Sequence, residues 1–228
     1  LTTQIKKQNV EIKLETEVTP ELVDKIRPDA VILATGSEPL IPDIPGIHGK
    51  RVVTARDVLA DKIKITKKKV VVAGGGMVGA ETAEFLAEQG NTVTIVEQFP
   101  HIAYDMELLH RKALMDSLKD KGVLMLTGRK VVEITGSQVV AEPSKLPPGA
   151  YRPLTGELQS SRGTPPKNER KERLETDWVV LALGVKPVRA LADTLEGKTT
   201  ELHTIGDCEG PRKLLEATYE GSLAARQL

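Results

Sequence analysis

The sequence predicts an α/β protein whose core is a parallel β-sheet. Short apolar runs rich in β-branched residues, such as 29–34 and 177–184, are typical of strands buried on both faces. Two further apolar strands are each followed by a stretch with helical spacing that ends at Gly90 or Gly122. Strands that alternate with helices in this way favour a parallel sheet joined by crossover helices.

The elements follow in chain order from hydrophobic spacing and turn residues. Alternation of Val10, Ile12 and Leu14 with charged residues predicts a half-buried strand over 9–17. Prolines at 39–45 indicate a crossover between domains. The proline-rich segment 143–175 predicts a long surface excursion with little regular structure. Further strands are expected over 29–34, 70–73, 92–96, 123–126, 130–134, 138–141, 177–184 and 202–205, with helices over 20–26, 77–89, 106–121 and 214–228.

Composition excludes several functional classes. The 32 Lys and Arg balance 32 Asp and Glu, so no overall field attracts nucleic acid or an anionic membrane. No apolar stretch approaches the roughly 20 residues of a membrane helix, and the N-terminus is polar, so we expect a soluble cytoplasmic protein. Cys208 is the single cysteine, which excludes a disulfide framework, and we expect a small buried residue there. The four histidines have no second ligand at metal spacing, so we expect no metal site.

The segment 70–97 has the sequence pattern of a βαβ unit that binds a dinucleotide. Gly74-x-Gly76-x-x-Gly79 follows an apolar strand and opens a helix, and the next strand ends at Glu97. Gly74 permits the tight turn, Gly76 lets a diphosphate approach the backbone, and Gly79 lets helix and strand pack closely. The helix N-terminus supplies free N–H groups to the phosphates. We therefore expect a Rossmann-like unit whose diphosphate-binding residues are Gly74, Gly75, Gly76, Met77, Val78 and Gly79.

Glu97 lies where the hydroxyls of the adenosine ribose would donate hydrogen bonds to it. A 2′-phosphate about 4 Å from this carboxylate would be opposed by roughly 4 kcal/mol per unit charge at an effective dielectric constant near 20. A third of that is about tenfold in affinity, so we expect NADH to bind more tightly than NADPH. The alternative is that lysine or arginine side chains from elsewhere neutralise the 2′-phosphate. A packing turn without a ligand is the structural alternative for the glycine motif.

The segments 29–39 and 177–187 resemble one another. Asp, Val, Leu, Ala, Gly and Pro coincide between them without a gap, which indicates an internal repeat. The glycine turn of the second copy opens about 100 residues before Asp177. The corresponding turn of the first copy would precede Leu1, so we expect the chain to be a fragment, and its non-Met start agrees.

Three features together carry a family resemblance. They are Ala34-Thr35-Gly36, the glycine motif with Glu97, and the run Thr204-Ile-Gly206-Asp207. With them the chain resembles the flavoproteins that have two dinucleotide-binding domains, the pyridine nucleotide-disulfide oxidoreductase superfamily. Its segment 204–221 is similar to the C-terminal region of old-yellow-enzyme-related NADH:flavin oxidoreductases, which include 2,4-dienoyl-CoA reductases and 2-enoate reductases.

The resemblance implies a domain organisation in which an NAD(H)-binding domain is inserted in a partial FAD-binding domain. Residues 1–45 would belong to the FAD-binding domain, whose N-terminal part is missing, 46–188 to the NAD(H)-binding domain, and 189–228 to the FAD-binding domain again. The resemblance also implies further cofactor-binding residues. These are Thr35 and Gly36 near the crossover, Gly206 and Asp207 facing the FAD, Glu81 near the nicotinamide, and Gly184. An Asx turn is the alternative for Asp207, and a solvated first-turn acid the alternative for Glu81.

The function implied is that of an NADH-dependent flavin oxidoreductase, in which NAD(H) is positioned for hydride transfer to FAD. By resemblance, the electrons would pass to an activated alkene such as an enoate or enoyl-CoA, and the partner would be an upstream flavin and iron–sulfur domain of the same polypeptide. We expect no catalytic side chain here, and the fragment alone to be inactive, binding NAD(H) but little FAD. The alternatives are a non-catalytic dinucleotide- or ADP-binding regulatory module, and a ferredoxin reductase or NADH oxidase of the same superfamily.

Overall fold

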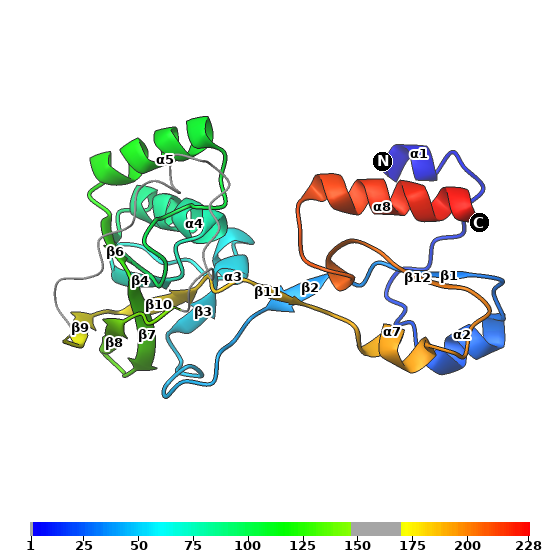
Figure 1. The fold of residues 1–228 in the computed structure, drawn as a ribbon, viewed down its shortest axis with the longest axis horizontal. Helices are drawn as coiled ribbons and strands as arrows, with labels where there is room; N and C mark the ends of the chain where they lie inside the picture. The colour runs from blue at the N-terminus through cyan, green and yellow to red at the C-terminus, as the bar shows by residue number, and fades with distance from the viewer. Residues whose placement is uncertain (1, 147–169) are drawn as a thin grey trace. The chain divides into compact units, whose positions relative to one another are not determined.

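The computed structural model describes residues 2–146 and 170–228, and the chain divides into two compact units (Figure 1). Unit 1 comprises residues 1–38 and 186–228, and unit 2 comprises residues 39–185. The chain passes between the units within two short strands that pair with one another, β2 (Ser37–Pro39) and β11 (Val185–Pro187). The unit boundaries therefore lie a few residues before the domain boundaries of 45/46 and 188/189 expected from the sequence.

Unit 2 is built on a five-stranded sheet with the strand order β3-β10-β4-β5-β6. Every neighbouring pair in this sheet is parallel. The predicted α/β class with a parallel sheet is therefore confirmed. The strands are β3 (Val52–Thr54), β4 (Lys69–Ala73), β5 (Thr92–Glu97), β6 (Leu124–Thr127) and β10 (Trp178–Leu181).

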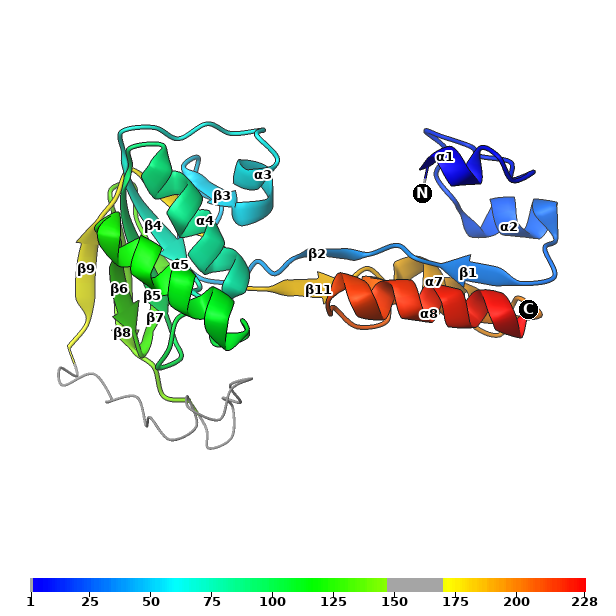
Figure 2. The ribbon, with the colours of Figure 1, turned by 90° about the horizontal axis from the view of Figure 1, so that it is seen from above.

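Alternating side chains of the sheet bury two separate cores. Val70, Val72 and Ile95 pack with apolar residues of the helices α3, α4 and α5. Val71 and Val96 belong to a second core, shared with an antiparallel sheet of order β7-β8-β9. Unit 2 thus has three layers, and Figure 2 shows α4 and α5 along one side of the strands. The bounds are α3 (Ala55–Leu59), α4 (Met77–Glu88), α5 (Leu108–Asp120), β7 (Arg129–Ile134), β8 (Gln138–Pro143) and β9 (Glu172–Glu175).

The crossover helices α4 and α5 end where the sequence predicts. Gly90 has a φ of +76° and Gly122 a φ of +70°, the left-handed conformation that commonly follows the last turn of a helix. Within α4, Ala80, Ala83 and Leu86 are buried, and their spacing of three places them on one face. These apolar positions hold α4 on the sheet and thereby fix the turn that precedes it.

Unit 1 contains a two-stranded parallel sheet, β1 (Val31–Leu33) with β12 (Leu202–Thr204). Val23, Leu33 and Leu195 form its small core together with Ala192. The predicted helix over 20–26 is α2 (Pro20–Ile26), which begins at the cap Thr19. The other elements are α1 (Thr2–Ile5), α7 (Ala190–Leu195), the short 3₁₀ helix η1 (Gly206–Cys208) and α8 (Leu214–Gln227).

The internal repeat has a structural counterpart in the pairing of β2 with β11. The amide of Leu40 donates to the carbonyl of Gly184, and the amide of Val188 donates to the carbonyl of Gly36, both at 3.0 Å. Gly36 and Gly184 occupy the same place in the two copies, and so do Leu40 and Val188. The two copies therefore exchange equivalent backbone hydrogen bonds.

Two expectations are wrong in part or in full. The segment 9–17 forms no strand, and Val10, Ile12 and Leu14 are 58%, 51% and 80% exposed. Strand formation requires a neighbour for the backbone groups, and none of the described strands pairs with this segment. The end of the expected excursion over 143–175 is also regular, because β9 pairs antiparallel with β8. Residues 147–169 of that excursion lie outside the described residues.

Candidate functional site

The turn between β4 and α4 places three glycines where each has a different constraint. Gly74 has a φ of +99°, and a Cβ there would lie 2.3 Å from the carbonyl oxygen of Ala182. A Cβ on Gly79 would lie 2.1 Å from the carbonyl oxygen of Gly74. Only glycine fits either position without a backbone shift. Gly76 is different, because a Cβ there would meet nothing nearer than 3.5 Å.

Gly75 has a constraint that the motif does not predict. A Cβ there would lie 2.6 Å from Cδ1 of Ile102 and 2.9 Å from Cγ2 of Ile95. Ile102 is buried and belongs to the segment that connects β5 to α5. The amide of Ala103 in the same segment donates to the carbonyl of Gly75 at 2.7 Å. The β5–α5 connection therefore packs directly on the glycine turn.

Glu97 lies at the end of β5, and its carboxylate is directed toward the glycine turn. The Glu97 carboxylate accepts hydrogen bonds from the amides of Gly75 at 2.5 Å and Phe99 at 2.7 Å. The residue is only 4% exposed. Burial raises the pKa of Glu97, and the hydrogen bonds from the backbone oppose that rise.

The N-terminus of α4 does not present all of its amides free, which corrects one expectation. The amide of Met77 donates to Oδ1 of Asp105 at 2.7 Å. The carboxylates of Asp105 and Glu97 both accept hydrogen bonds from amides of the turn and so give it a negative surrounding. Burial, and then the charges of Asp105 and Glu97, raise the pKa of Tyr104. Asp105 was not predicted as a residue of the site. The strand order could have predicted it. Asp105 follows β5, which pairs with β4, and the connections after neighbouring parallel strands meet at the same edge of a sheet.

The remaining candidates of unit 2 lie around the same edge of the sheet. Val78 and Glu81 are exposed on the first turns of α4. Gly184 follows β10, the strand beside β4, and adopts a φ of +92°. Open space surrounds its Cβ position. The structure thus places each of these residues at the carboxyl ends of the parallel strands, where open α/β sheets bind ligands.

In unit 1 the candidate residues form a separate cluster after β1 and β12. The hydroxyl of Ser37 donates to Asp207 at 2.8 Å, which joins the segment of Thr35 and Gly36 to Asp207. The Thr35 hydroxyl donates to the carbonyl of Val188 at 2.7 Å. The other oxygen of Asp207 accepts from the amide of Arg212 at 3.3 Å, five residues on, whereas an Asx turn would use the amide two residues on. Ser37 gave no sequence signal, since a serine after a strand is common.

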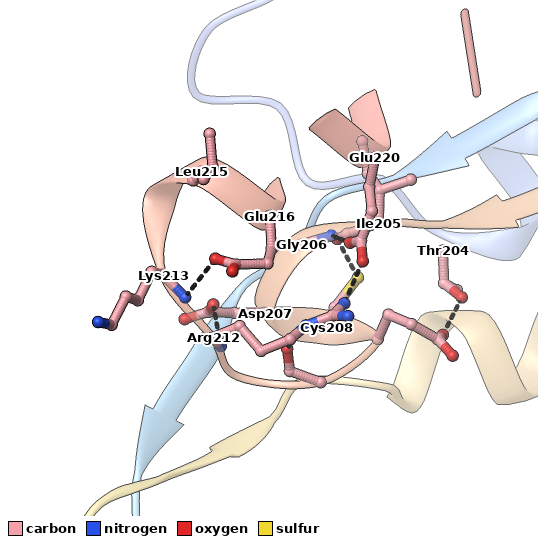
Figure 3. A network of polar contacts seen from close by, with 12 residues as sticks. Thr204, Ile205, Gly206, Asp207, Cys208, Arg212, Lys213, Leu215, Glu216 and Glu220 are labelled. Atoms are coloured by element: carbon pink, nitrogen blue, oxygen red, sulfur yellow. Dashed lines mark hydrogen bonds and ion pairs between the residues drawn. The ribbon is translucent and has the colours of Figure 1, made fainter. Parts of the chain in front are cut away.

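The amide of Gly206 is also occupied from within unit 1. Glu220 on α8 accepts from this amide at 2.8 Å and pairs with the Arg212 side chain (Figure 3). Gly206 itself has a φ of +66°. The run 204–207 is therefore held in place by α8.

Cys208 is fully buried, as expected. Its thiol lies 3.1 Å from the carbonyl oxygens of Leu33 and Ile205, so it packs as a small residue under β1. In the described parts of the chain, no group of three or more acidic, histidine or cysteine side chains is arranged to hold a metal ion. Those parts also contain no helix with the length and apolar character needed to cross a membrane.

Comparison with known proteins gives consistent results. The family described as pyridine nucleotide-disulphide oxidoreductase matches residues 1–205. An NADH oxidase of Thermoanaerobacter brockii is 36% identical over 100% of the chain and 32% of its own length, and a bilirubin reductase of Mediterraneibacter gnavus is 35% identical with the same coverage. A solved structure of 2-naphthoyl-CoA reductase superposes with a TM-score of 0.79 at 30% identity, covering 96% of this chain and 30% of that one. The chain thus spans about a third of the length of these relatives.

Proposed function

The chain belongs to the pyridine nucleotide-disulphide oxidoreductase family, whose domains bind FAD and NAD(P)H. We propose that it forms the NAD(H)-binding part and a segment of the FAD-binding part of an NADH-dependent flavin oxidoreductase. The observation that carries this proposal is the contact between Glu97 and Gly75. It joins the acid that would bind the ribose to the turn that would bind the diphosphate.

Unit 2 supports the binding of a dinucleotide in three ways. A Cβ added at Gly76 would meet nothing nearer than 3.5 Å, and the three atoms nearest to it all belong to the Asp105 carboxylate. The amide of Met77, at the positive end of the helix dipole, donates to the Asp105 carboxylate that lies over Gly76. Glu97 remains an acceptor for ribose hydroxyls beside the turn. The residues present therefore fit the diphosphate of NAD(H) when the Asp105 side chain moves off the Met77 amide.

The preference for NADH over NADPH follows from charge. Glu97 and Asp105 both lie beside the turn, and Asp105 adds to the rise in the pKa of Glu97 through its negative charge. A 2′-phosphate on the ribose would meet the charge of Glu97, whereas Asp105 lies at the diphosphate position that both cofactors share. This side of the site therefore favours a ribose with free hydroxyls.

The chemistry proposed needs no acid or base from this chain. NAD(H) supplies the hydride and the flavin accepts it, and the protein provides binding and orientation. Asp207, Gly206 and the segment of Thr35 and Gly36 are proposed to contact the FAD, because they cluster after β1 and β12 at the carboxyl ends of parallel strands. We further propose an enoate or enoyl thioester as the final acceptor, supported by the similarity to a 2-naphthoyl-CoA reductase.

The test has two parts. The 228-residue chain is titrated with NADH, and binding is expected, with little or no binding of FAD. A protein that carries this chain after its preceding flavin domains is then mixed with NADH without oxygen, and the flavin absorbance is expected to bleach. Binding without bleaching would favour a regulatory dinucleotide-binding module, and absence of binding would contradict the proposal altogether.

A further inference from the structure

The side chain of Asp105 lies on the N-terminus of α4, where the proposed function places the diphosphate. Its Oδ1 accepts a hydrogen bond from the amide of Met77 at 2.7 Å. The three atoms nearest to a Cβ added at Gly76 all belong to the Asp105 carboxylate group, at 3.5, 3.6 and 3.8 Å. One side chain therefore covers the place at which a ligand would approach the backbone.

The backbone around Asp105 is fixed by other contacts. The amide of Ala103 donates to the carbonyl of Gly75 at 2.7 Å, and Nε of Arg111 donates to the carbonyl of Ile102 at 2.9 Å. Ile102 and Ala103 are 2% and 0% exposed, and Met106 is buried as well. Asp105 itself is only partly buried. Its carboxylate can thus leave the turn by rotation of the side chain while the buried neighbours keep their positions.

A diphosphate at this turn would accept a hydrogen bond from the Met77 amide, which already donates to Asp105. Both groups are anions that accept hydrogen bonds from the N-terminal amides and are stabilised by the positive end of the helix dipole. They repel one another at short distance, so they do not share the turn. A dinucleotide therefore binds only in exchange for the contact between Asp105 and Met77.

We propose that Asp105 is an internal competitor of the diphosphate and thereby sets the affinity of the site for dinucleotides. This inference rests on the proposed function, because it takes the turn as the diphosphate site. It has a specific signature. Asp105 weakens the binding of ligands that contain the diphosphate, such as NAD⁺ and ADP, and has no effect on adenosine, which lacks it.

Isothermal titration of the 228-residue chain with NAD⁺, ADP and adenosine tests the proposal. Asp105→Asn keeps the size of the side chain and an acceptor for the Met77 amide but removes the charge. We expect this variant to bind NAD⁺ and ADP about tenfold more tightly than the wild type, or about 1.4 kcal/mol, and adenosine equally well. Asp116→Asn on the exposed face of α5 makes the same change in net charge and is expected to bind like the wild type.

The outcomes separate the two proposals. Binding of NAD⁺ by the wild type, with equal or weaker binding by Asp105→Asn, overturns the inference and leaves the proposed function intact. Equal tightening in Asp116→Asn, or tightening for adenosine as well, also overturns the inference. Failure of all variants to bind NAD⁺ overturns both proposals. If Asp105→Asn unfolds, Asp105→Ser takes its place, with the same tightening expected.

Discussion

The carboxylate of Glu97 accepts a hydrogen bond from the amide of Gly75, so the end of β5 and the glycine turn after β4 form one structural unit. The other carboxylate oxygen of Glu97 accepts a hydrogen bond from the amide of Phe99, in the connection from β5 to α5. Glu97 therefore positions both backbone segments that border the proposed nucleotide site. Substitution of Glu97 is expected to change the binding of the cofactor, because the acid is proposed to contact the ribose.

Replacement of Glu97 is expected to change cofactor choice. The wild type should bind NADH at least tenfold more tightly than NADPH, because the carboxylate opposes a 2′-phosphate. Glu97→Gln should weaken NADH binding about tenfold through loss of a charged acceptor for the ribose, and should reduce the ratio between the two cofactors. Fluorescence titration with both cofactors measures this. Glu107→Gln, at an exposed cap without a side-chain hydrogen bond, is the control. Equal binding of NADPH by the wild type would contradict the prediction.

The stability of the chain is expected to depend on the ionisation of Glu97. Burial raises its pKa above the usual 4.5, so the folded state holds this proton more tightly than the unfolded state does. The contribution to stability is then fully present below pH 4.5 and is lost as the pH rises through the raised pKa.

Urea unfolding at a series of pH values tests this dependence. The unfolding free energy of the wild type, relative to that of Glu97→Gln, is expected to fall as the pH rises through that window. The variant lacks the titrating group, so it subtracts the contribution of all other acids. A difference that rises with pH, or stays constant, would show that the carboxylate is not held as the structure indicates.

Two glycine substitutions separate packing from ligand binding. Gly79→Ala places a Cβ 2.1 Å from the Gly74 carbonyl oxygen and is expected to destabilise unit 2 by about 1–3 kcal/mol or more. Gly76→Ala has space, and its φ of −63° suits alanine, so stability should change little. The added methyl group at Gly76 would stand between the backbone and a diphosphate, and NAD⁺ affinity should fall at least tenfold.

Thermal unfolding and NAD⁺ titration of the two glycine variants make the comparison. A stable Gly76→Ala variant with wild-type affinity would contradict the diphosphate assignment. A stable Gly79→Ala variant would instead contradict the packing of α4 on the turn.

Cys208 is expected to have a packing role and no redox role. Cys208→Ala should lower the unfolding free energy by about 1 kcal/mol through loss of buried atoms, and NAD⁺ affinity should not change. The thiol is fully buried, so a thiol reagent should modify the folded chain far more slowly than the unfolded chain. Rapid modification of the folded protein would be inconsistent with the contacts to Leu33 and Ile205.

The sequence predicted the parts of the fold that depend on local pattern. The βαβ unit from β4 to β5 has strong signals, because apolar runs, glycine stops and helical spacing agree. The short elements α3, α7 and β3 were not predicted. The strand predicted over 9–17 is absent although its pattern is clear. A strand depends on a neighbour, and the pattern does not supply one.

The sequence predicted most residues of the candidate site, but not that the Asp105 side chain lies on it. The motif identified Gly74, Gly79 and Glu97, whose places follow from steric fit and from the length of the βαβ unit. That Asp105 binds the Met77 amide depends on how the β5–α5 connection folds over the turn, through Ile102 and other buried contacts. Such tertiary packing has no period in the sequence.

Amide NMR of the ¹⁵N-labelled chain during titration with NAD⁺ tests the central claim most directly. The claim is that the backbone amides of the turn bind the diphosphate in exchange for Asp105. The account predicts that the largest saturable shift changes occur in residues 75–79 and in the segment 98–106 that contains Asp105. Unchanged amides in both segments at saturating NAD⁺, or changes concentrated elsewhere, would contradict it.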